Sequence, residues 1–433
     1  MADNITEKKL GIIEVKALRD ANGLMEGNTH LKSVECPFPA LTNGSNMFKD
    51  CINLTLFYCD DLSKLYNGTS MFGGCEKLSS VIGSGGNPLN LSSLSNGTSM
   101  FYYTKNISQF IADLPSLTNG TSMFLDSSLT IFDSSLPIIS TYNDMFAGCP
   151  LSTFKCKELG ISSSGKDFIT ISKLEDTKFS LINFNANMSY VTTANEMFIG
   201  FKSLKNFEGN MPSLTNADKM FCESSLETFK SNNLSKLTIA TNMFENCNIV
   251  ISGHTGNGFT TFDCDELPLL HDGSRMFYNT ELSSFNASLP KLSIGNEMFY
   301  STSLSSFNVD LPYLSIANDM FEDCDSLKSF TSDLPKLSTY TYMFSGTRLN
   351  TFDGGDIGIT DTGLDFITNS YLKNSKDTLT SFKGNLTKST NTDEMFVEFN
   401  KLDTFEGDMN NVTSSKKMFK DCEQLQTFKS NNL

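Results

Sequence analysis

The chain has 433 residues, a formal net charge of −16 at pH 7 and 39% hydrophobic residues, so it can bury a sizeable core. The acidic balance, with lysines grouped in pairs at most, excludes electrostatic binding to nucleic acid or to an anionic membrane surface. The opening MADNITEKKLGIIEVKALRD lacks the apolar segment of a cleavable secretory signal, and no run of about 18 apolar residues predicts membrane insertion.

Residues 1–23 are expected to form an N-terminal cap, and 24–433 a single array of repeats. The pair Met-Phe recurs fourteen times, most often at intervals of 22 to 24 residues. Such an interval corresponds to one supersecondary unit and lies in the range of leucine-rich repeats. The methionines of the pairs are Met47, Met71, Met100, Met123, Met145, Met197, Met220, Met243, Met276, Met298, Met320, Met343, Met395 and Met418.

Three further turns are hidden in the array. A degenerate first turn begins at Leu24-Met25. Each of the two 52-residue intervals holds another turn, because Asp167-Phe168 and Asp365-Phe366 lie 22 residues after a Met of the repeat. The sequence therefore predicts an α/β-type, leucine-rich-repeat-like solenoid of about seventeen turns of 22–30 residues, with one short parallel strand per turn.

A longer period lies above the first. Met100, Met145, Met197 and Met220 each have a counterpart 198 residues later, and KDFIT is matched by LDFIT. We expect tandem blocks at about 47–242 and 243–433, the second with an incomplete last turn. An open end exposes core and a strand edge, so we expect it to continue in a longer array or to dock on another surface.

The strand prediction rests on alternation around one phenylalanine per turn. Phe307, Val309 and Leu311 alternate with Asn308 and Asp310, which is the pattern of a strand with one buried face. The proline of the following LPxL segment cannot donate to a sheet ladder, so the chain leaves the strand there. Segments such as TNGTSMF then supply turn residues for one short helical or irregular stretch with Met and Phe inward.

Cysteine columns follow the repeat. Since Ser, Thr, Ala or Gly occupies the same columns in other turns, we interpret cysteine here as a small buried residue and expect no disulfide ladder. Only Cys222 falls outside both columns. Cys51, Cys75, Cys149, Cys247, Cys324 and Cys422 follow Met by four residues, and Cys36, Cys59, Cys156 and Cys264 take the small inward strand place.

No cofactor, catalytic or metal-binding residue is predicted. His30, His254 and His271 lie far apart in register, and no CxxC or HxxxH spacing supplies a zinc site. A row of outward carboxylates along the strands keeps a calcium site open as an alternative, beside its role in blocking edge association. The row comprises Asp113, Asp133, Glu208, Asp263, Asp265, Asp310, Asp333, Glu406 and Asp408.

Tyrosines are the better candidates for a binding surface, because tyrosine offers contact area and a hydroxyl at a low entropic cost. Partial burial between turns is the alternative interpretation. The candidate surface comprises Tyr102, Tyr103, Tyr278, Tyr300, Tyr340 and Tyr342, with Asp310 and Asp333. Contacts are also expected where the regular surface is broken, at the long turns after Asp167 and Asp365 and at the insertions near Gly83 and His254.

The text MFxxCxxLxxF followed by LPxL resembles the BspA-like class of leucine-rich repeats, over roughly residues 24–433. This resemblance implies one strand per turn on a parallel sheet and a role in surface attachment, with no catalytic residues to carry over. The chain departs from the commoner pattern by using Met-Phe for Ala-Phe and Phe for Ile at the central strand position.

The leading hypothesis is a non-catalytic attachment or recognition module that binds a protein or glycan. Its expected setting is extracellular, on a cell surface, a virion or a phage fibre. The main alternative is a structural building block whose chains stack into a fibre or filament, so that the partners are further copies of itself in a homo-oligomer. An enzyme is the third alternative, which a stack of similar turns without a unique cleft disfavours.

Overall fold

The computed structural model describes the residues from 17 to 431, apart from 162, 248–257 and 265. The predicted insertion at His254, Asp265 and most of the predicted cap therefore lie outside the described residues. The chain forms two compact units, the first made of Met1–Thr192 and Phe201–Met211, the second of Thr193–Gly200 and Pro212–Leu433. The tandem blocks and the cap stay predictions, and the units meet in sequence near residues 192–212, not at Met243.

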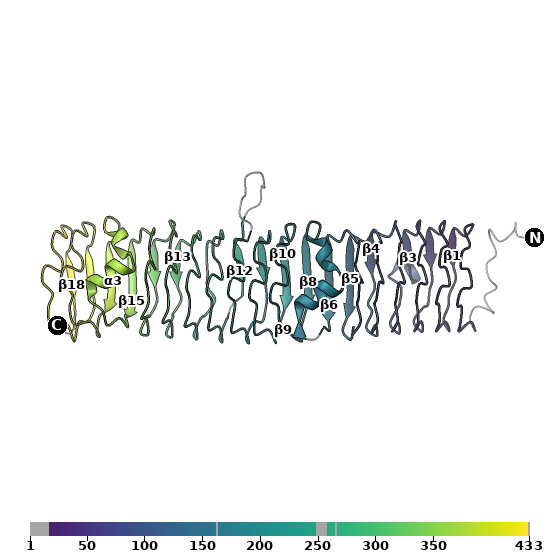
Figure 1. Ribbon diagram of the computed structural model, residues 1–433, viewed down its shortest axis with the longest axis horizontal. Coiled ribbons are helices and arrows are strands. Elements are labelled where there is room, and N and C mark those ends of the chain that lie inside the picture. Colours follow the sequence, from purple (N-terminus) through teal and green to yellow (C-terminus); the bar gives the residue numbers. More distant parts are fainter. Residues whose placement is uncertain (1–16, 162, 248–257, 265, 432–433) are drawn as a thin grey trace, which may run out of the picture. The chain divides into compact units, whose positions relative to one another are not determined.

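Strands β1 to β3, and strands β4, β5, β6, β8 and β10, pair in parallel in the first unit, as the repeat predicts, and its turns succeed one another side by side (Figure 1). One sheet has the order β1-β2-β3, and a second runs β4-β5-β6-β8-β10. The strands are β1 (Ser33–Glu35), β2 (Leu56–Tyr58), β3 (Ser80–Ile82), β4 (Gln109–Ile111), β5 (Ile131–Leu136), β6 (Thr153–Leu159), β7 (Ser163–Ser164), β8 (Asn183–Asn187) and β10 (Asn206–Asn210), with β9 (Val191–Thr193) at the unit boundary.

The second unit repeats this arrangement. Strands β11 and β12 pair in parallel, and six further strands follow in the order β13 to β18. The central phenylalanines face one another in register, so that Phe307 lies opposite Phe330 and Phe330 opposite Phe352. The strands are β11 (Thr228–Lys230), β12 (Thr261–Asp263), β13 (Ser306–Asn308), β14 (Ser329–Thr331), β15 (Thr351–Asp356), β16 (Ser381–Asn385), β17 (Thr404–Glu406) and β18 (Thr427–Lys429).

The prediction of a solenoid of about seventeen turns is confirmed. Most strands carry a buried central phenylalanine, whereas β1 and β3 carry valine there and Phe428 of β18 is 44% exposed. In the turn of Met276 the phenylalanine is buried but the backbone forms no strand. Its Phe285 is 4% exposed and stacks against Phe262 and Phe307, yet no regular strand forms there, and an isolated bridge joins Glu266 to Ser288. Side-chain stacking therefore continues where the strand ladder is interrupted.

The segment that carries the Met-Phe pair forms consecutive β-turns, which we call the turn face. In the turn of Met298, the Tyr300 N–H closes a turn onto the Glu297 carbonyl at 3.2 Å, whereas the Phe299 N–H donates to the Met320 carbonyl of the next turn at 2.9 Å. Donors alternate in this way along the segment. The sequence left a helical and an irregular form open, and the regular turns take the non-helical form.

Helices replace β-turns in the two hidden turns. They are α2 (Gly165–Ile171) and α3 (Gly363–Asn369), the coiled ribbons in Figure 1. Ser164 and Thr362 cap them, each accepting from the backbone N–H three residues on. Phe168 and Phe366 are fully buried, as the register predicts. Short 3-10 segments are η1 (Ser84–Gly86), η2 (Leu174–Thr177) and η3 (Leu372–Ser375).

The cysteines of the described residues are free, and all but Cys422 are buried, which confirms the interpretation of these columns. The column also has a polar role, because the Cys324 Sγ donates to the Phe299 carbonyl at 3.0 Å. Thr347 satisfies the carbonyl of Phe344 in the same way, at 2.7 Å. Burial raises the pKa of the Cys324 thiol to about 11, so it stays protonated and unreactive.

Among the helices that the structure describes, none has the length and apolar character needed to cross a bilayer.

Candidate functional site

Three columns of side chains point outward from the turn face, at positions −1, +2 and +3 relative to the Met of each pair. In the second unit these columns contain Tyr278, Tyr300 and Tyr342, and Tyr371 packs against Tyr342. We call these four residues the tyrosine stripe. Tyr278 and Tyr300 occupy position +2 in adjacent turns, and Tyr342 occupies position −1. Tyr371 follows α3 in the next, longer turn.

Positions −1 and +3 adopt a left-handed backbone. Arg275, Glu297 and Tyr342 have φ values of 56°, 52° and 58°. A non-glycine residue in this region costs roughly 1 to 2 kcal/mol relative to glycine. Glycine does occur at position +3, as in Gly346, but never at position −1 of the Met-Phe turns. Position −1 therefore carries a side chain in every Met-Phe turn, although glycine would adopt this backbone conformation at a lower free energy.

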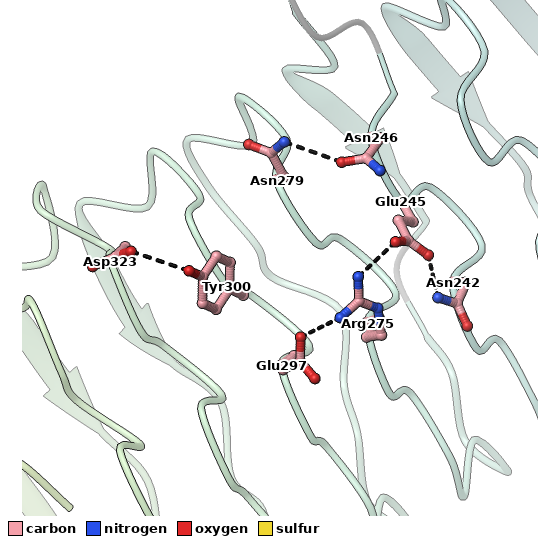
Figure 2. A network of polar contacts seen from close by, with 8 residues as sticks. All are labelled: Asn242, Glu245, Asn246, Arg275, Asn279, Glu297, Tyr300 and Asp323. Atoms are coloured by element: carbon pink, nitrogen blue, oxygen red, sulfur yellow. Dashed lines mark hydrogen bonds and ion pairs between the residues drawn. The ribbon is translucent and has the colours of Figure 1, made fainter.

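Arg275 organises one end of the stripe (Figure 2). Its guanidinium donates to Glu245 at 2.6 Å on one side and to Glu297 on the other. The same group lies 3.7 Å from the centre of the Tyr278 ring. Because these side chains are partly buried, the ion pairs and the cation–π contact are screened less than at a fully exposed site. Arg275 therefore holds three adjacent turns in a fixed arrangement.

The rings of Tyr278 and Tyr300 are stacked, and the hydroxyl of Tyr300 is held by a hydrogen bond. Tyr278 and Tyr300 have ring centres 4.6 Å apart and planes inclined by 13°. The Tyr300 hydroxyl donates to Asp323 at 3.2 Å (Figure 2). Burial, with the nearby charge of Asp323, raises the pKa of Tyr300 to about 12, so its hydroxyl remains a donor at neutral pH. This half of the stripe presents a preorganised aromatic surface.

A pair of carboxyl groups lies in the next turn. Burial raises the pKa of both Asp319 and Glu322, and their mutual hydrogen bond and charge raise that of Glu322 further. Beyond them Tyr342 lies against Tyr371, with ring centres 4.6 Å apart. The Tyr342 side chain is 41% exposed, and its pKa is raised first by its contact with Tyr371 and then by the charges of Asp319 and Glu322.

Replacement of Asp319 by asparagine should stabilise the second unit at pH 7.5, by roughly 0.5 kcal/mol. A carboxyl whose pKa is raised in the folded state opposes folding above that pKa, and this opposition disappears as the pH falls through it. The melting temperature of Asp319→Asn should therefore exceed that of wild type at pH 7.5 and match it near pH 4. Asp325→Asn, an exposed change in the same turn, is the control; a gain that persists at pH 4 would contradict the explanation.

With the geometry described, the comparisons with known proteins can be set beside it. A family model for the BspA type leucine rich repeat region matches six copies, over residues 22–127, 46–174 and 273–371, which is more than half of the chain. The chain belongs to the BspA type leucine-rich-repeat family. No curated protein matches it.

Two solved structures align with this BspA type chain over most of its length. A leucine rich cell surface protein from Faecalibacterium prausnitzii A2-165 is 16% identical, with 93% of this chain and 80% of that chain covered and a TM-score of 0.24. The plant peptide hormone receptor RGFR1 in complex with RGF2 is 12% identical, with 93% and 79% covered and a TM-score of 0.21. At these scores the family assignment rests on the repeat sequence.

The tyrosines predicted as a binding surface are divided between the two units. Tyr102 and Tyr103, at 40% and 39% exposure, belong to the first unit, where Lys105 lies 4.0 Å from the Tyr103 ring centre. Tyr340 is wrong as an exposed candidate, since it is 4% exposed and donates to Asp361 at 2.7 Å. Position −3 faces the core, so Tyr340 packs edge-on against Phe366 instead of reaching solvent.

Asp310 and Asp333 are exposed beside the strands and share no turn-face column with the tyrosines. The predicted row of outward acids is partly neutralised by lysines on neighbouring strands. Lys155 reaches Asp133 at 2.8 Å, and Lys429 reaches Glu406 at 2.8 Å. In the described part of the chain, no three His, Cys, Asp or Glu side chains are grouped as a metal site would need. Calcium binding was only the alternative to a predicted absence of metal, and it stays an untested alternative.

The insertion near Gly83 borders a hollow of about 460 Å³ in the first unit. The hollow is open, and Ile111, which lines it, is 46% exposed. It lies beside the strands, where the sequence predicted contacts, but it holds no aromatic side chain. Its lining residues are Pro88, Leu89, Asn90, Leu91, Ser92, Ile111, Ala112, Asp113, Pro115 and Asp133.

Sequence reasoning missed Arg275, Glu322 and Tyr371. Arg275 follows Glu245 by 30 residues and precedes Glu297 by 22, so its partners lie in the preceding and the following turn. Alignment of the −1 and +2 columns turn by turn brings these charges together. Tyr371 offers no such signal, because α3 shifts the register of its turn.

Proposed function

We propose that this protein is a non-catalytic recognition module, displayed at a cell surface, that binds a protein ligand through the tyrosine stripe of its second unit. The observation that carries the proposal is the fixed, solvent-accessible arrangement of Tyr278, Tyr300 and Tyr342. Their rings are held by stacking, by Arg275 and by the hydrogen bond to Asp323.

Preorganised tyrosines suit protein binding for a physical reason. A ring that is already immobilised loses little side-chain entropy on binding, so more of its contact energy contributes to affinity. Tyrosine and arginine are also the residue types that dominate the energetic centres of protein interfaces. The retention of side chains at strained −1 positions supports a role in contact, because glycine there would favour the scaffold alone.

Display at a surface comes from the resemblance to BspA-like repeats and forms part of the proposal. A virion or phage-fibre setting and a glycan ligand are alternatives within the same class of function. The structural building block is the alternative from another class. A chain with a net charge of −16 repels its own copies at low salt, which favours the recognition module.

A peptide-display selection tests the proposed function. Random peptides would be selected on the native chain and counter-screened on a variant that combines Tyr278→Ser with Tyr300→Ser. The control variant combines Tyr66→Ser with Tyr190→Ser, two residues that are each 60% exposed and lie outside the stripe. We expect the selected peptides to lose at least about tenfold in affinity for the first variant and to keep it for the control.

Peptides that bind all three proteins equally would overturn the proposal. Light scattering on the same preparations separates it from the building-block alternative. Discrete particles of constant mass are expected for a recognition module, whereas open-ended polymers at micromolar concentration would favour a filament.

A further inference from the structure

We infer that the ligand of the tyrosine stripe is a basic protein segment, whose lysine or arginine side chains lie over the tyrosine rings beside Asp319 and Glu322. This inference rests on the proposed function and adds the chemistry of the partner. Two observations support it: the excess of carboxylates along the stripe, and the way Arg275 of this chain binds a tyrosine ring and two carboxylates.

The charges are strongly unbalanced. Positions −1, +2 and +3 in the turns of Met243, Met276, Met298 and Met320 hold five carboxylates and one arginine. The carboxylates are Glu245, Glu297, Asp319, Glu322 and Asp323. Arg275 is already bound on both sides, by Glu245 and Glu297. The ion pairs between described residues thus leave Asp319, Glu322 and Asp323 without a cation, apart from the hydrogen bond that Asp323 accepts from Tyr300. The potential at this end of the stripe attracts a cationic ligand.

The chain's own Arg275 shows how a cation fits this surface. Its guanidinium lies over the face of a tyrosine, 3.7 Å from the Tyr278 ring centre. The same group lies between the carboxylates of Glu245 and Glu297 in the neighbouring turns (Figure 2). Farther along the stripe, Asp319 and Tyr342 occupy position −1 of adjacent turns, as Arg275 and Glu297 do, and Glu322 occupies position +2 of the same turn as Asp319. In the described part of the chain, no ion pair joins a lysine or arginine to Asp319 or Glu322.

The two sides of this second arrangement are both aromatic. Glu322 belongs to the turn between those of Tyr300 and Tyr342, and its carbonyl accepts from the Ser301 N–H at 2.8 Å. Lys373 lies 4.4 Å from the ring centre of Tyr371, the ring that packs against Tyr342. A ligand cation here would gain a carboxylate and a ring face together, as Arg275 does.

The occupant is therefore a basic segment of a protein, not a second copy of this acidic chain. A segment with basic side chains at intervals could follow the stripe from turn to turn, since parallel turns repeat at about 4.8 Å. Uncharged and acidic segments, and a second copy, become outcomes of the test.

Fluorescence anisotropy with three labelled twelve-residue peptides tests the inference. The peptides share a Gly-Ser framework and carry four Arg, four Gln or four Glu residues. At pH 7.5 and low salt we expect the Arg peptide to bind the full chain at least about tenfold more tightly than the Gln peptide, and the Glu peptide not to bind. The advantage should shrink at 150 mM salt.

Variants locate the contact. Glu322→Gln and Tyr342→Ser should each weaken the Arg peptide by about fivefold or more. Serine occupies the position of Tyr342 in other turns, as Ser70 and Ser99 do, so the second variant keeps the backbone conformation. Asp325→Asn removes one exposed charge of the same turn and should change binding by less than about twofold.

Equal binding of the Arg and Gln peptides, or an equal loss with Asp325→Asn and Glu322→Gln, would overturn the inference. The display selection separates the two levels of the argument. If selected peptides depend on Tyr278 and Tyr300 but are neutral or acidic, the proposed function stands and the basic ligand is excluded. If no selected peptide depends on these tyrosines, the proposed function itself fails.

Discussion

Replacement of Phe299 by alanine should lower the free energy of unfolding of the second unit by about 3 to 5 kcal/mol. The side chain is fully buried directly beneath the tyrosine stripe. It stacks on Phe277 and Phe321 at 5.5 and 5.4 Å and meets Phe285 and Phe307 edge-on at 5.1 and 5.5 Å. Alanine would leave a cavity whose aromatic walls belong to neighbouring turns, so they cannot close it without breaking the strand register.

Urea unfolding followed by tyrosine fluorescence measures this effect, since the chain contains no tryptophan. Phe179→Ala makes the same chemical change at a side chain that is 80% exposed, and it should alter the stability by less than about 0.5 kcal/mol. Comparable losses from the two variants would show that the phenylalanine stack does not hold the turns together.

Replacement of Gly160 by alanine should destabilise the first unit by about 3 kcal/mol or more. A Cβ at this position would lie 1.8 Å from the carbonyl oxygen of Pro137 in the preceding turn. The Gly160 N–H donates to Leu136 at 2.9 Å, so the two backbones are held together at the place where the clash would occur. The obstacle is backbone, which no change of side-chain rotamer can relieve.

Thermal unfolding by circular dichroism should show the loss as a lower melting temperature or as a fall in the yield of folded protein. Gly73→Ala is the matched control, because its Cβ would meet neighbours only at 3.4 Å or more, and other turns carry Lys49 or Tyr102 in that column. If the two alanine variants melt together, the contact between Gly160 and Pro137 does not limit the approach of the turns. Gly358 repeats this contact against Pro335 in the second unit and should respond alike.

Much of the fold could be predicted from the sequence because each inward column is determined by packing. The phenylalanine at a fixed distance from Met-Phe is expected to be buried, and Phe307 and Phe330 are. The same logic found the hidden turns at Phe168 and Phe366. It did not find that these turns are helical, because the added length leaves the backbone several ways to bury the same residue.

The candidate site could be predicted only in part. Column arithmetic placed Tyr278 and Tyr300 together, and they stack. It failed for Tyr340, since an aromatic residue next to a turn signal is compatible with either face of the backbone. The role of Arg275 depends on three turns at once, so composition and local spacing give no hint of it. Such contacts are found by aligning the turns, because residues one repeat apart in the sequence are neighbours in space.

The hydrogen bonds of the turn face have an evolutionary consequence. In the turn of Met298, Glu297, Phe299 and Ser301 all donate to the following turn, and only backbone atoms take part. A turn therefore fits its neighbour by conformation, whatever side chains it carries at positions −1 and +2. Recombination between segments that encode such turns would exchange whole turns, with their tyrosines and carboxylates already in place. Ligand preference in this protein could then change by rearrangement faster than by successive point mutations.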